Sequence, residues 1–223
     1  MKFQFYISLI FFLVISCWES TTSKKNSTGT DTLNVEFISN QDDTLRQYAF
    51  IKFKQQKIGL DSIQGGYDSL QFRIWDLQGL FGHMEVYVIK NNQYKWTAEY
   101  YSIHGDSNFN DGLILDEFEW GDEPFNIVKQ KQLMPRIPWK KFVDSLISFD
   151  IMILPDMESV KGMEVTWTDG SWIVIEVANK NGYRVYHYNS PHRFEKFEEA
   201  NKIEGILSLI SNELEERGDT KTF

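Results

Sequence analysis

The sequence is short of cysteine, of clustered basic residues and of long apolar runs, and each shortage excludes a class of protein. The one cysteine, Cys17, has no partner for an intramolecular disulfide, so the fold must be stable without one. The net charge is −9 and no basic run is longer than Lys140-Lys141, which argues against nucleic acid as a partner. The apolar run from Phe5 to Ile15 is shorter than the roughly 20 residues of a membrane-spanning helix.

Signatures of catalytic, metal and cofactor sites are also missing. The sequence contains no HExxH, no CxxC, no GxSxG and no Gly-rich phosphate loop. His187 and His192 are close in the chain, but their spacing supplies no third zinc ligand. The loop DSNFND lacks the glycine spacing and the closing glutamate of a calcium loop. We therefore expect no metal and no cofactor, and the sequence favours a protein that is not an enzyme.

The first feature that is present is a secretory signal. Lys2 precedes the apolar run Phe5 to Ile15, whose length matches the roughly 7–15 residues of a signal peptide's apolar core. Val14-Ile15-Ser16-Cys17 resembles the lipobox of bacterial lipoproteins. The resemblance implies cleavage after residue 16, acylation of the Cys17 thiol by palmitate or a similar chain, and acylation of the new amino terminus. The alternative is an ordinary cleaved signal beside a stray thiol, which would be exposed to oxidation.

After the signal peptide, residues 1–16, the chain divides into a tether and a domain. Residues 17–32 are rich in Ser, Thr, Lys, Asn and Gly without apolar periodicity, so we expect a flexible tether that begins at the lipidated cysteine. Residues 33–223 have the length of a single globular domain. Trp18 stands where some lipoproteins carry the aspartate that retains them in the inner membrane. The resemblance therefore favours the cell envelope, at the outer membrane, as the destination.

Alternating apolar residues predict strands through most of the domain. Two hairpins are marked by turn residues, Lys90-Asn91-Asn92-Gln93 in the first and Asn179-Lys180-Asn181-Gly182 in the second. The expected strands are Tyr48 to Phe53, Leu70 to Trp75, His83 to Ile89, Tyr94 to Ile103, Phe125 to Leu133, Met163 to Trp167, Trp172 to Val177 and Tyr183 to Tyr188.

Helical spacing appears twice. Pro138 is expected at the first position of one helix, and apolar residues at helical spacing follow as far as Ile147. Ser190 is expected to cap a second helix that begins at Pro191 and continues to Gly218. Strands that do not alternate with helices predict an α+β fold, an antiparallel sheet of hairpins with two amphipathic helices packed on it.

Residues 70–212 resemble a set of bacterial secreted proteins and lipoproteins that share several short motifs. In this chain the motifs are Phe72-Arg73-Ile74-Trp75, Phe81-Gly82-His83, Trp139, Leu154-Pro155, Asp169-Gly170 with Trp172 and Glu176, a Tyr-rich strand, and Ser190-Pro191 with Phe194. Residues 102–123 depart from the shared pattern. No activity is established for the set, so the resemblance implies a shared fold and no particular chemistry.

One group of residues, Asp169, Trp172, Glu176 and His187, is the candidate functional cluster. Trp172 and Glu176 have the same parity on one expected strand, so their side chains project from one face of the sheet. His187 lies on the neighbouring arm of the hairpin, where a carboxylate beside it could act as an acid–base pair. The alternative is an ion pair between Glu176 and Arg184 on a solvated face, without a functional role.

Two functions of different classes stay open. Seven tryptophans, ten tyrosines and the missing catalytic motifs favour a non-catalytic, lipid-anchored module that binds a protein, a peptide or a sugar through exposed aromatic side chains. The alternative is an envelope hydrolase, in which Glu176 or Asp169 hydrogen-bonds to His187 or His83. The tryptophans that could form an exposed patch are Trp75, Trp96, Trp120, Trp167 and Trp172.

Overall fold

The structure, a computed structural model, describes residues 51, 54–56, 58–78, 83–105, 125–164 and 170–216. All of them belong to the unit Asn34–Phe223, one of the two into which the chain divides. The expected signal peptide, Cys17 and the tether lie outside the described residues. For residues 104, 105 and 125–129 only the backbone is described.

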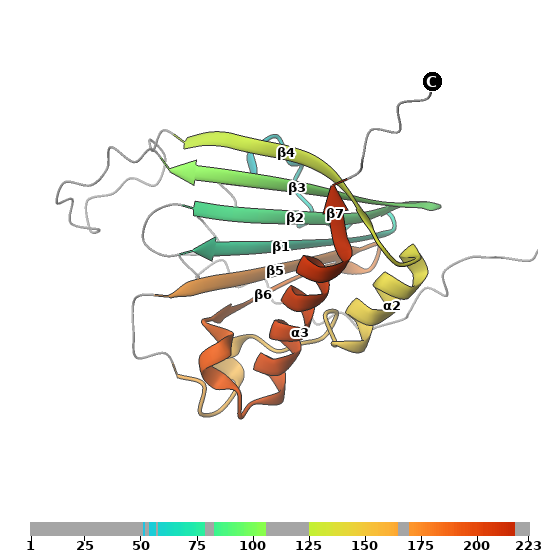
Figure 1. The fold of residues 1–223 in the computed structure, drawn as a ribbon. Helices are drawn as coiled ribbons and strands as arrows, with labels where there is room; N and C mark the ends of the chain where they lie inside the picture. Colours follow the sequence, from blue (N-terminus) through green and yellow to red (C-terminus); the bar gives the residue numbers. More distant parts are fainter. Residues whose placement is uncertain are drawn as a thin grey trace, which may run out of the picture. The chain divides into compact units, whose positions relative to one another are not determined.

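Seven strands in the described part of the chain form one antiparallel sheet, in the order β6-β5-β1-β2-β3-β4-β7 (Figure 1). The strands are β1 (Leu70–Gln78), β2 (His83–Asn92), β3 (Lys95–Gly105), β4 (Phe125–Pro135), β5 (Ser171–Asn179), β6 (Gly182–Asn189) and β7 (Leu214–Glu216). The expected α+β class with an antiparallel sheet is confirmed. β1 pairs on one side with β2 and on the other with β5, which follows much later in the chain.

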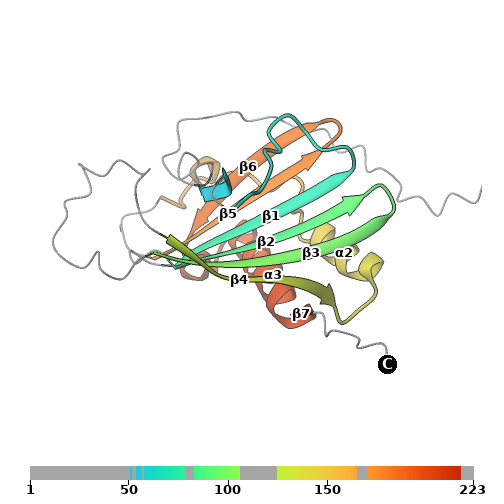
Figure 2. The same cartoon turned by 90° about the horizontal axis from the view of Figure 1, so that it is seen from above.

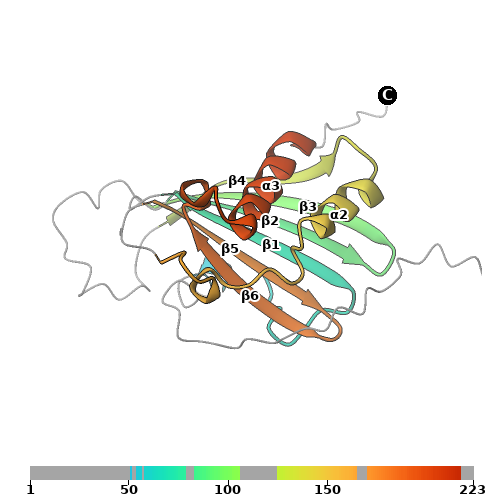
Figure 3. The ribbon, with the colours of Figure 1, turned by 90° about the horizontal axis from the view of Figure 1, so that it is seen from below.

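One face of the sheet packs against the helices α2 (Trp139–Ser148) and α3 (Glu198–Glu213), which cross it side by side in Figure 3. Phe72 and Ile74 of β1 share a buried cluster with Phe142 of α2 and Ile206 of α3. The apolar residues of α2 recur every three or four positions, so that they form one stripe toward the sheet. The even-numbered residues of β1 therefore face the helices.

The odd-numbered residues of β1 face the other side of the sheet, where a second buried cluster forms. Trp75 of β1 and Val88 of β2 pack there with Ile58 and Ile63, which belong to residues 58–69. We call residues 58–69 the cover; Figure 2 shows this segment on the face turned away from the helices. Because the sheet is covered on both faces, five consecutive residues of β1, 71–75, are buried.

Two of the expected strands differ from the structure where the structure describes them. In the range Tyr48 to Phe53 the structure describes only Ile51, which is helical rather than extended. Residues 54–56, just after this range, are helical too. The range begins with four consecutive apolar residues, so its period does not distinguish a strand from a buried helix. Met163 is likewise outside any strand, because its N–H closes a turn onto the carbonyl of Val160. The end of that range, residues 165–167, lies outside the described residues.

The helix starts also differ from expectation. Pro138 has an extended ψ of 138°, so it is the residue before the helix rather than its first residue. Ser190 adopts a left-handed conformation with φ of 45° and makes no side-chain cap. It precedes a short 3₁₀ turn, η4 (Pro191–Phe194), and α3 begins separately at Glu198. The expected continuous helix is broken because Phe197 is extended, with φ of −102° and ψ of 130°.

Candidate functional site

The structure describes three members of the candidate cluster, while Asp169 lies outside the described residues. Trp172 and Glu176 project from one face, as expected from their parity, and it is the face that carries the cover; His187 projects from the same face. The Trp172 and His187 rings stack with their centroids 5.4 Å apart. The carboxylate of Glu176 has different neighbours. The cluster therefore consists of two separate arrangements, one at Glu176 and one at His187.

The carboxylate of Glu176 is buried between three strands. It accepts hydrogen bonds from Nε1 of Trp75 at 2.7 Å and from the hydroxyl of Tyr183 at 2.8 Å. Burial raises the pKa of Glu176, and the charge of Arg73, directly opposite in the β1–β5 register, opposes that rise. The expectation that Arg184 is the charge partner is wrong. Its side chain lies on the opposite face, where it donates to the carbonyl of Leu154.

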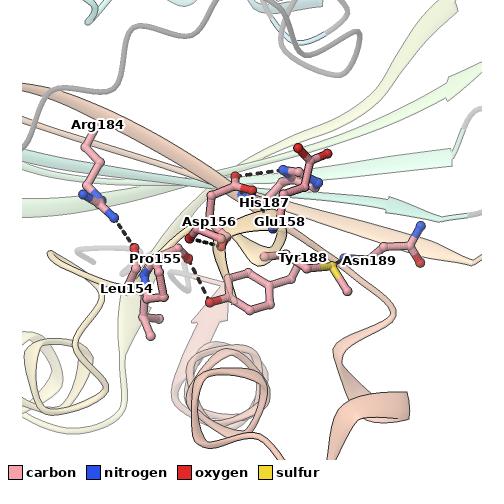
Figure 4. Close-up of polar contacts among 10 residues, drawn as sticks. Leu154, Pro155, Asp156, Glu158, Arg184, His187, Tyr188 and Asn189 are labelled. Carbon is pink, nitrogen blue, oxygen red and sulfur yellow. Dashed lines mark hydrogen bonds and ion pairs between the residues drawn. The ribbon is translucent and has the colours of Figure 1, made fainter. Parts of the chain in front are cut away.

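His187 pairs with a carboxylate that the sequence did not single out (Figure 4). Its Nδ1 lies 2.9 Å from Oδ2 of Asp156, and its backbone N–H donates to the same oxygen at 3.0 Å. Burial raises the pKa of Asp156, but the hydrogen bonds and charge of His187 outweigh burial and lower it overall. The side chain of His187 is only 3% exposed.

The contacts of Asp156 belong to a segment that runs along β6, the terminal strand of the sheet. We call residues 154–157 the strap. The hydroxyl of Tyr188 donates to the carbonyl of Pro155 at 2.9 Å, and the backbone N–H of Asn189 donates to the sulfur of Met157 at 3.1 Å. The strap thus satisfies outward N–H groups that a terminal strand otherwise leaves free for pairing. This explains the Asp156–His187 pair as part of the fold.

A cavity of about 640 Å³ lies on the other side of the sheet from the helices, between the cover and strands β1 to β3. Ligand sites in proteins typically measure about 300–1,000 Å³, so the cavity is large enough for a small organic molecule. Its floor is made by the side chains of Gln71, Arg73, Val88, Lys90, Glu99 and Tyr101. None of the three described members of the candidate cluster lines it.

Arg73 is the most unusual residue of the floor, because a charged side chain in the middle of a strand is only 2% exposed. Its Nη2 donates to the carbonyl of Asp61 in the cover at 2.6 Å. When the amide of Gln71 is oriented with its oxygen toward the guanidinium, that oxygen accepts from Nε at 2.8 Å and from Nη2 at 3.2 Å. Nη1 is buried and has no hydrogen-bond partner among the described residues.

The other charged residues of the floor neutralise each other. Nζ of Lys90 lies 2.9 Å from Oε1 of Glu99, and the hydroxyl of Tyr101 donates to Oε2 of the same carboxylate at 2.8 Å. Burial raises the pKa of Glu99, but the bonds from Lys90 and Tyr101 outweigh burial and lower it overall. Burial and Glu99 together raise the pKa of Tyr101 to about 12. Glu99 is thus an ionised carboxylate whose two oxygens already accept from Lys90 and Tyr101.

The cover is attached to the sheet at its far end by a backbone hydrogen bond and a side-chain hydrogen bond, both from Tyr67. The N–H of Tyr67 donates to the carbonyl of Asn179 at 3.0 Å, and the hydroxyl of Tyr67 donates to Oδ1 of Asn92 at the tip of the β2–β3 hairpin. Gly66 has a φ of 95°, and a Cβ at this position would lie 2.9 Å from the carbonyl oxygen of Asn179. Only glycine permits this close approach without strain.

The described tryptophans form no exposed aromatic surface. Trp75 is fully buried, and Trp96 is stacked between Phe72 and Trp139 over the helix-side core. Trp172 is partly exposed beside His187. Trp120 and Trp167 lie outside the described residues. Within the parts of the chain given above, no group of three or more His, Cys, Asp or Glu side chains could hold a metal ion. No helix in those parts is long and apolar enough to cross a membrane.

Comparison with known proteins adds no relative: no family model, no curated protein and no solved structure matches the chain. The candidate site therefore rests on geometry, and the geometry favours the cavity. Sequence reasoning named Arg73 only as part of an apolar strand motif and did not identify it as a site residue. One feature of the sequence could have identified Arg73 as a site residue: it is a charged residue between two apolar residues, Phe72 and Ile74, which are both buried in β1.

Proposed function

We propose that this chain is a lipid-anchored module of the bacterial cell envelope that binds a small ligand in the cavity between the cover and the sheet. The observation that carries the proposal is the cavity itself, whose volume of about 640 Å³ lies within the range of ligand sites and whose floor offers polar groups for hydrogen bonds to a ligand. The two amphipathic helices pack on the opposite face of the sheet and do not contribute to the cavity lining. A sugar, a short peptide end or another small molecule is of suitable size, whereas a folded protein is not.

The anchor in this proposal is a lipid on Cys17, for which the lipobox resemblance of residues 14–17 is the support. One acyl chain holds a protein only weakly at a membrane, so stable attachment requires the further acylation that the resemblance implies. A tether from Cys17 to about residue 32 would let the domain face the aqueous side, with the outer membrane as the favoured location.

The hydrolase alternative is supported by one observation, the Asp156–His187 pair. Its partners differ from those first considered, since Glu176 bonds to Trp75 and Tyr183. Both residues of the pair are engaged in holding the strap to β6, and neither lines the cavity. A binding module is therefore the better-supported function.

Ligand binding is tested with the full-length chain purified from bacterial membranes in a neutral detergent. Small molecules released on denaturation are compared by mass spectrometry with those from Ser69→Trp, which places a large side chain at the cavity lining. Ser211→Trp, on an exposed turn of α3, is the matched control. We expect a compound that is present in the wild type and in Ser211→Trp and absent from Ser69→Trp. Equal recovery from all three proteins would contradict the proposal.

The anchor is tested on the same preparation. We expect the mature chain to begin at Cys17 and to carry the added mass of acyl groups. Replacement of Cys17 with alanine should release the protein from the membrane fraction. A mature chain that starts after residue 17, or an unmodified thiol, would show that the anchor proposal is wrong while leaving the cavity proposal to its own experiment.

A further inference from the structure

We propose that the cavity recognises an oxyanion, a carboxylate or phosphate group on a small organic molecule, and that Arg73 is the residue that binds it. This inference rests on the proposed function, because it names the class of ligand for the same cavity. It is carried by the incomplete hydrogen bonding of a buried guanidinium that belongs to the cavity floor.

Arg73 has more hydrogen-bond donors than the described residues supply acceptors for. A guanidinium has five N–H groups and no acceptor. Nε and Nη2 are directed at the oxygens of Gln71 and Asp61, which accounts for three of the five. The two N–H groups of Nη1 have no acceptor among the described residues. A buried charged donor without an acceptor has a high free-energy cost. A ligand oxygen that accepts from Nη1 would remove this cost, which favours binding.

The charge of Arg73 is not paired with a carboxylate of the cavity floor. The only carboxylate on the floor, Glu99, is already paired with Lys90. Glu176 lies opposite Arg73 in the register, but its two oxygens accept hydrogen bonds from Trp75 and Tyr183 rather than from Arg73. In the described part of the chain, Arg73 has no carboxylate within ion-pair distance. An anionic ligand would supply that missing partner, and charge-assisted bonds of this type are the strongest class of hydrogen bond.

The rest of the cavity lining carries more negative than positive charge. Asp61 and Asp68 of the cover are exposed at the rim, so that the lining carries two cations, Arg73 and Lys90, and three carboxylates including Glu99. A net negative lining disfavours a ligand that carries several anionic groups. The geometry therefore points to a ligand with a single oxyanion at Arg73 and an uncharged body in the remaining volume.

Because Nη1 is shielded from bulk water, the ligand must displace part of the cover to reach it. This displacement would break the hydrogen bond from Nη2 to the carbonyl of Asp61, which links Arg73 directly to the cover. Binding of an anion should therefore change the amide hydrogen exchange of residues 58–69. The strap, on a different part of the sheet, should show no such change.

The experiment uses the full-length chain in a neutral detergent and three probes of similar size: para-fluorobenzoate, its neutral amide para-fluorobenzamide, and the cation para-fluorobenzylamine. Fluorine NMR titrations measure the affinity for each probe, and inorganic phosphate is added as a competitor. Ser69→Trp, measured in the same micelles, shows how much of each signal comes from the detergent. We expect the benzoate to bind roughly tenfold or more tightly than the amide, which is the contribution of one charge-assisted hydrogen bond.

Two variants test Arg73 directly. Arg73→Gln should lose roughly tenfold or more of the benzoate affinity and little of the amide affinity, while Arg73→Lys should retain part of the preference for the anion. Lys140→Gln, which removes an exposed cation from α2 outside the cavity lining, is the matched control and should leave the affinity for each probe unchanged. If the Arg73 variants do not fold, the ranking of the three probes on the wild type and the hydrogen exchange of residues 58–69 still decide the question.

The outcomes separate the two proposals. If all three probes bind equally and Ser69→Trp abolishes their binding, the cavity is a ligand site and the anion inference is wrong. If no probe binds to the cavity, the anion inference is wrong. The proposed function is then decided by the other experiment, in which the small molecules recovered from the wild type and from Ser69→Trp are compared. Competition by phosphate would indicate a phosphate-bearing ligand, and its absence a carboxylate.

Discussion

Replacement of Gly66 with alanine is expected to destabilise the protein by about 2–5 kcal/mol, as the sum of two costs. A left-handed backbone costs an alanine about 1–2 kcal/mol relative to glycine, and φ at Gly66 is 95°. The added Cβ would lie 2.9 Å from the carbonyl oxygen of Asn179, so the cover must shift, as in overpacked cores that lose about 1–3 kcal/mol. The shift would also strain the bond from the N–H of Tyr67 to the same carbonyl.

Two neighbouring glycines separate these costs. Gly59 has a φ of 74° but no atom within 4 Å of an added Cβ, so Gly59→Ala should lose only the backbone term of about 1–2 kcal/mol. Gly65 has neither a positive φ nor a close neighbour, and Gly65→Ala should gain about 0.4–1 kcal/mol through the lower entropy of the unfolded chain.

The assay is urea denaturation of the full-length variants in a neutral detergent, followed by tryptophan fluorescence and circular dichroism. The expected order of stability is Gly65→Ala, wild type, Gly59→Ala and then Gly66→Ala. The reasoning fails if Gly66→Ala is as stable as Gly59→Ala, since the cover would then not be in contact with the Asn179 carbonyl. It also fails if Gly65→Ala is the most damaging of the three.

Two further predictions concern buried carboxyl groups and depend on pH. Glu176 has a raised folded-state pKa, so its contribution to stability is fully present below its ordinary pKa of 4.5 and is lost as pH rises through the folded value. Glu176→Gln should therefore gain stability relative to the wild type as the pH rises above about 4.5, and a difference that is constant with pH would contradict this. Asp156 has a lowered pKa, so its contribution is present above its ordinary value of 3.8 and is lost as pH falls through the folded value. Asp156→Asn should cost about 1–3 kcal/mol near neutral pH, with a loss that shrinks in acid; urea midpoints across the pH range measure both variants.

The antiparallel α+β fold could be predicted from the sequence because local signals were strong. The turn residues between β5 and β6 and the alternating residues of β1 located those strands within a few positions. The expected four-residue loop at Lys90-Asn91-Asn92-Gln93 is shorter in the structure, since Asn92 still pairs with Lys95. What the local signals could not supply was the order of the strands. The pairing of β1 with β5 depends on contacts between residues far apart in the chain.

The site was harder to predict for the same reason. Trp172 and Glu176 were correctly placed on one face, and His187 on the neighbouring strand, but the groups that contact Glu176 and His187 come from distant segments. The Pro155-Asp156 pair indicated a turn and gave no sign of a contact with β6. Arg73 stood in a motif whose other members are core residues, and its unfilled donors become visible only when the cover and floor are assembled.

The position of β1 has a consequence for how the chain acquires its fold. The bond from Trp75 to Glu176 joins residues separated by 101 positions, so the centre of the sheet closes only after most of the polypeptide has been synthesised. Until β5 has been synthesised, β1 can pair only with β2. The other edge of β1, which pairs with β5 in the finished sheet, is then exposed and can pair with other chains. Such late, non-local closure slows folding and extends the time during which a nascent chain depends on chaperones to prevent aggregation.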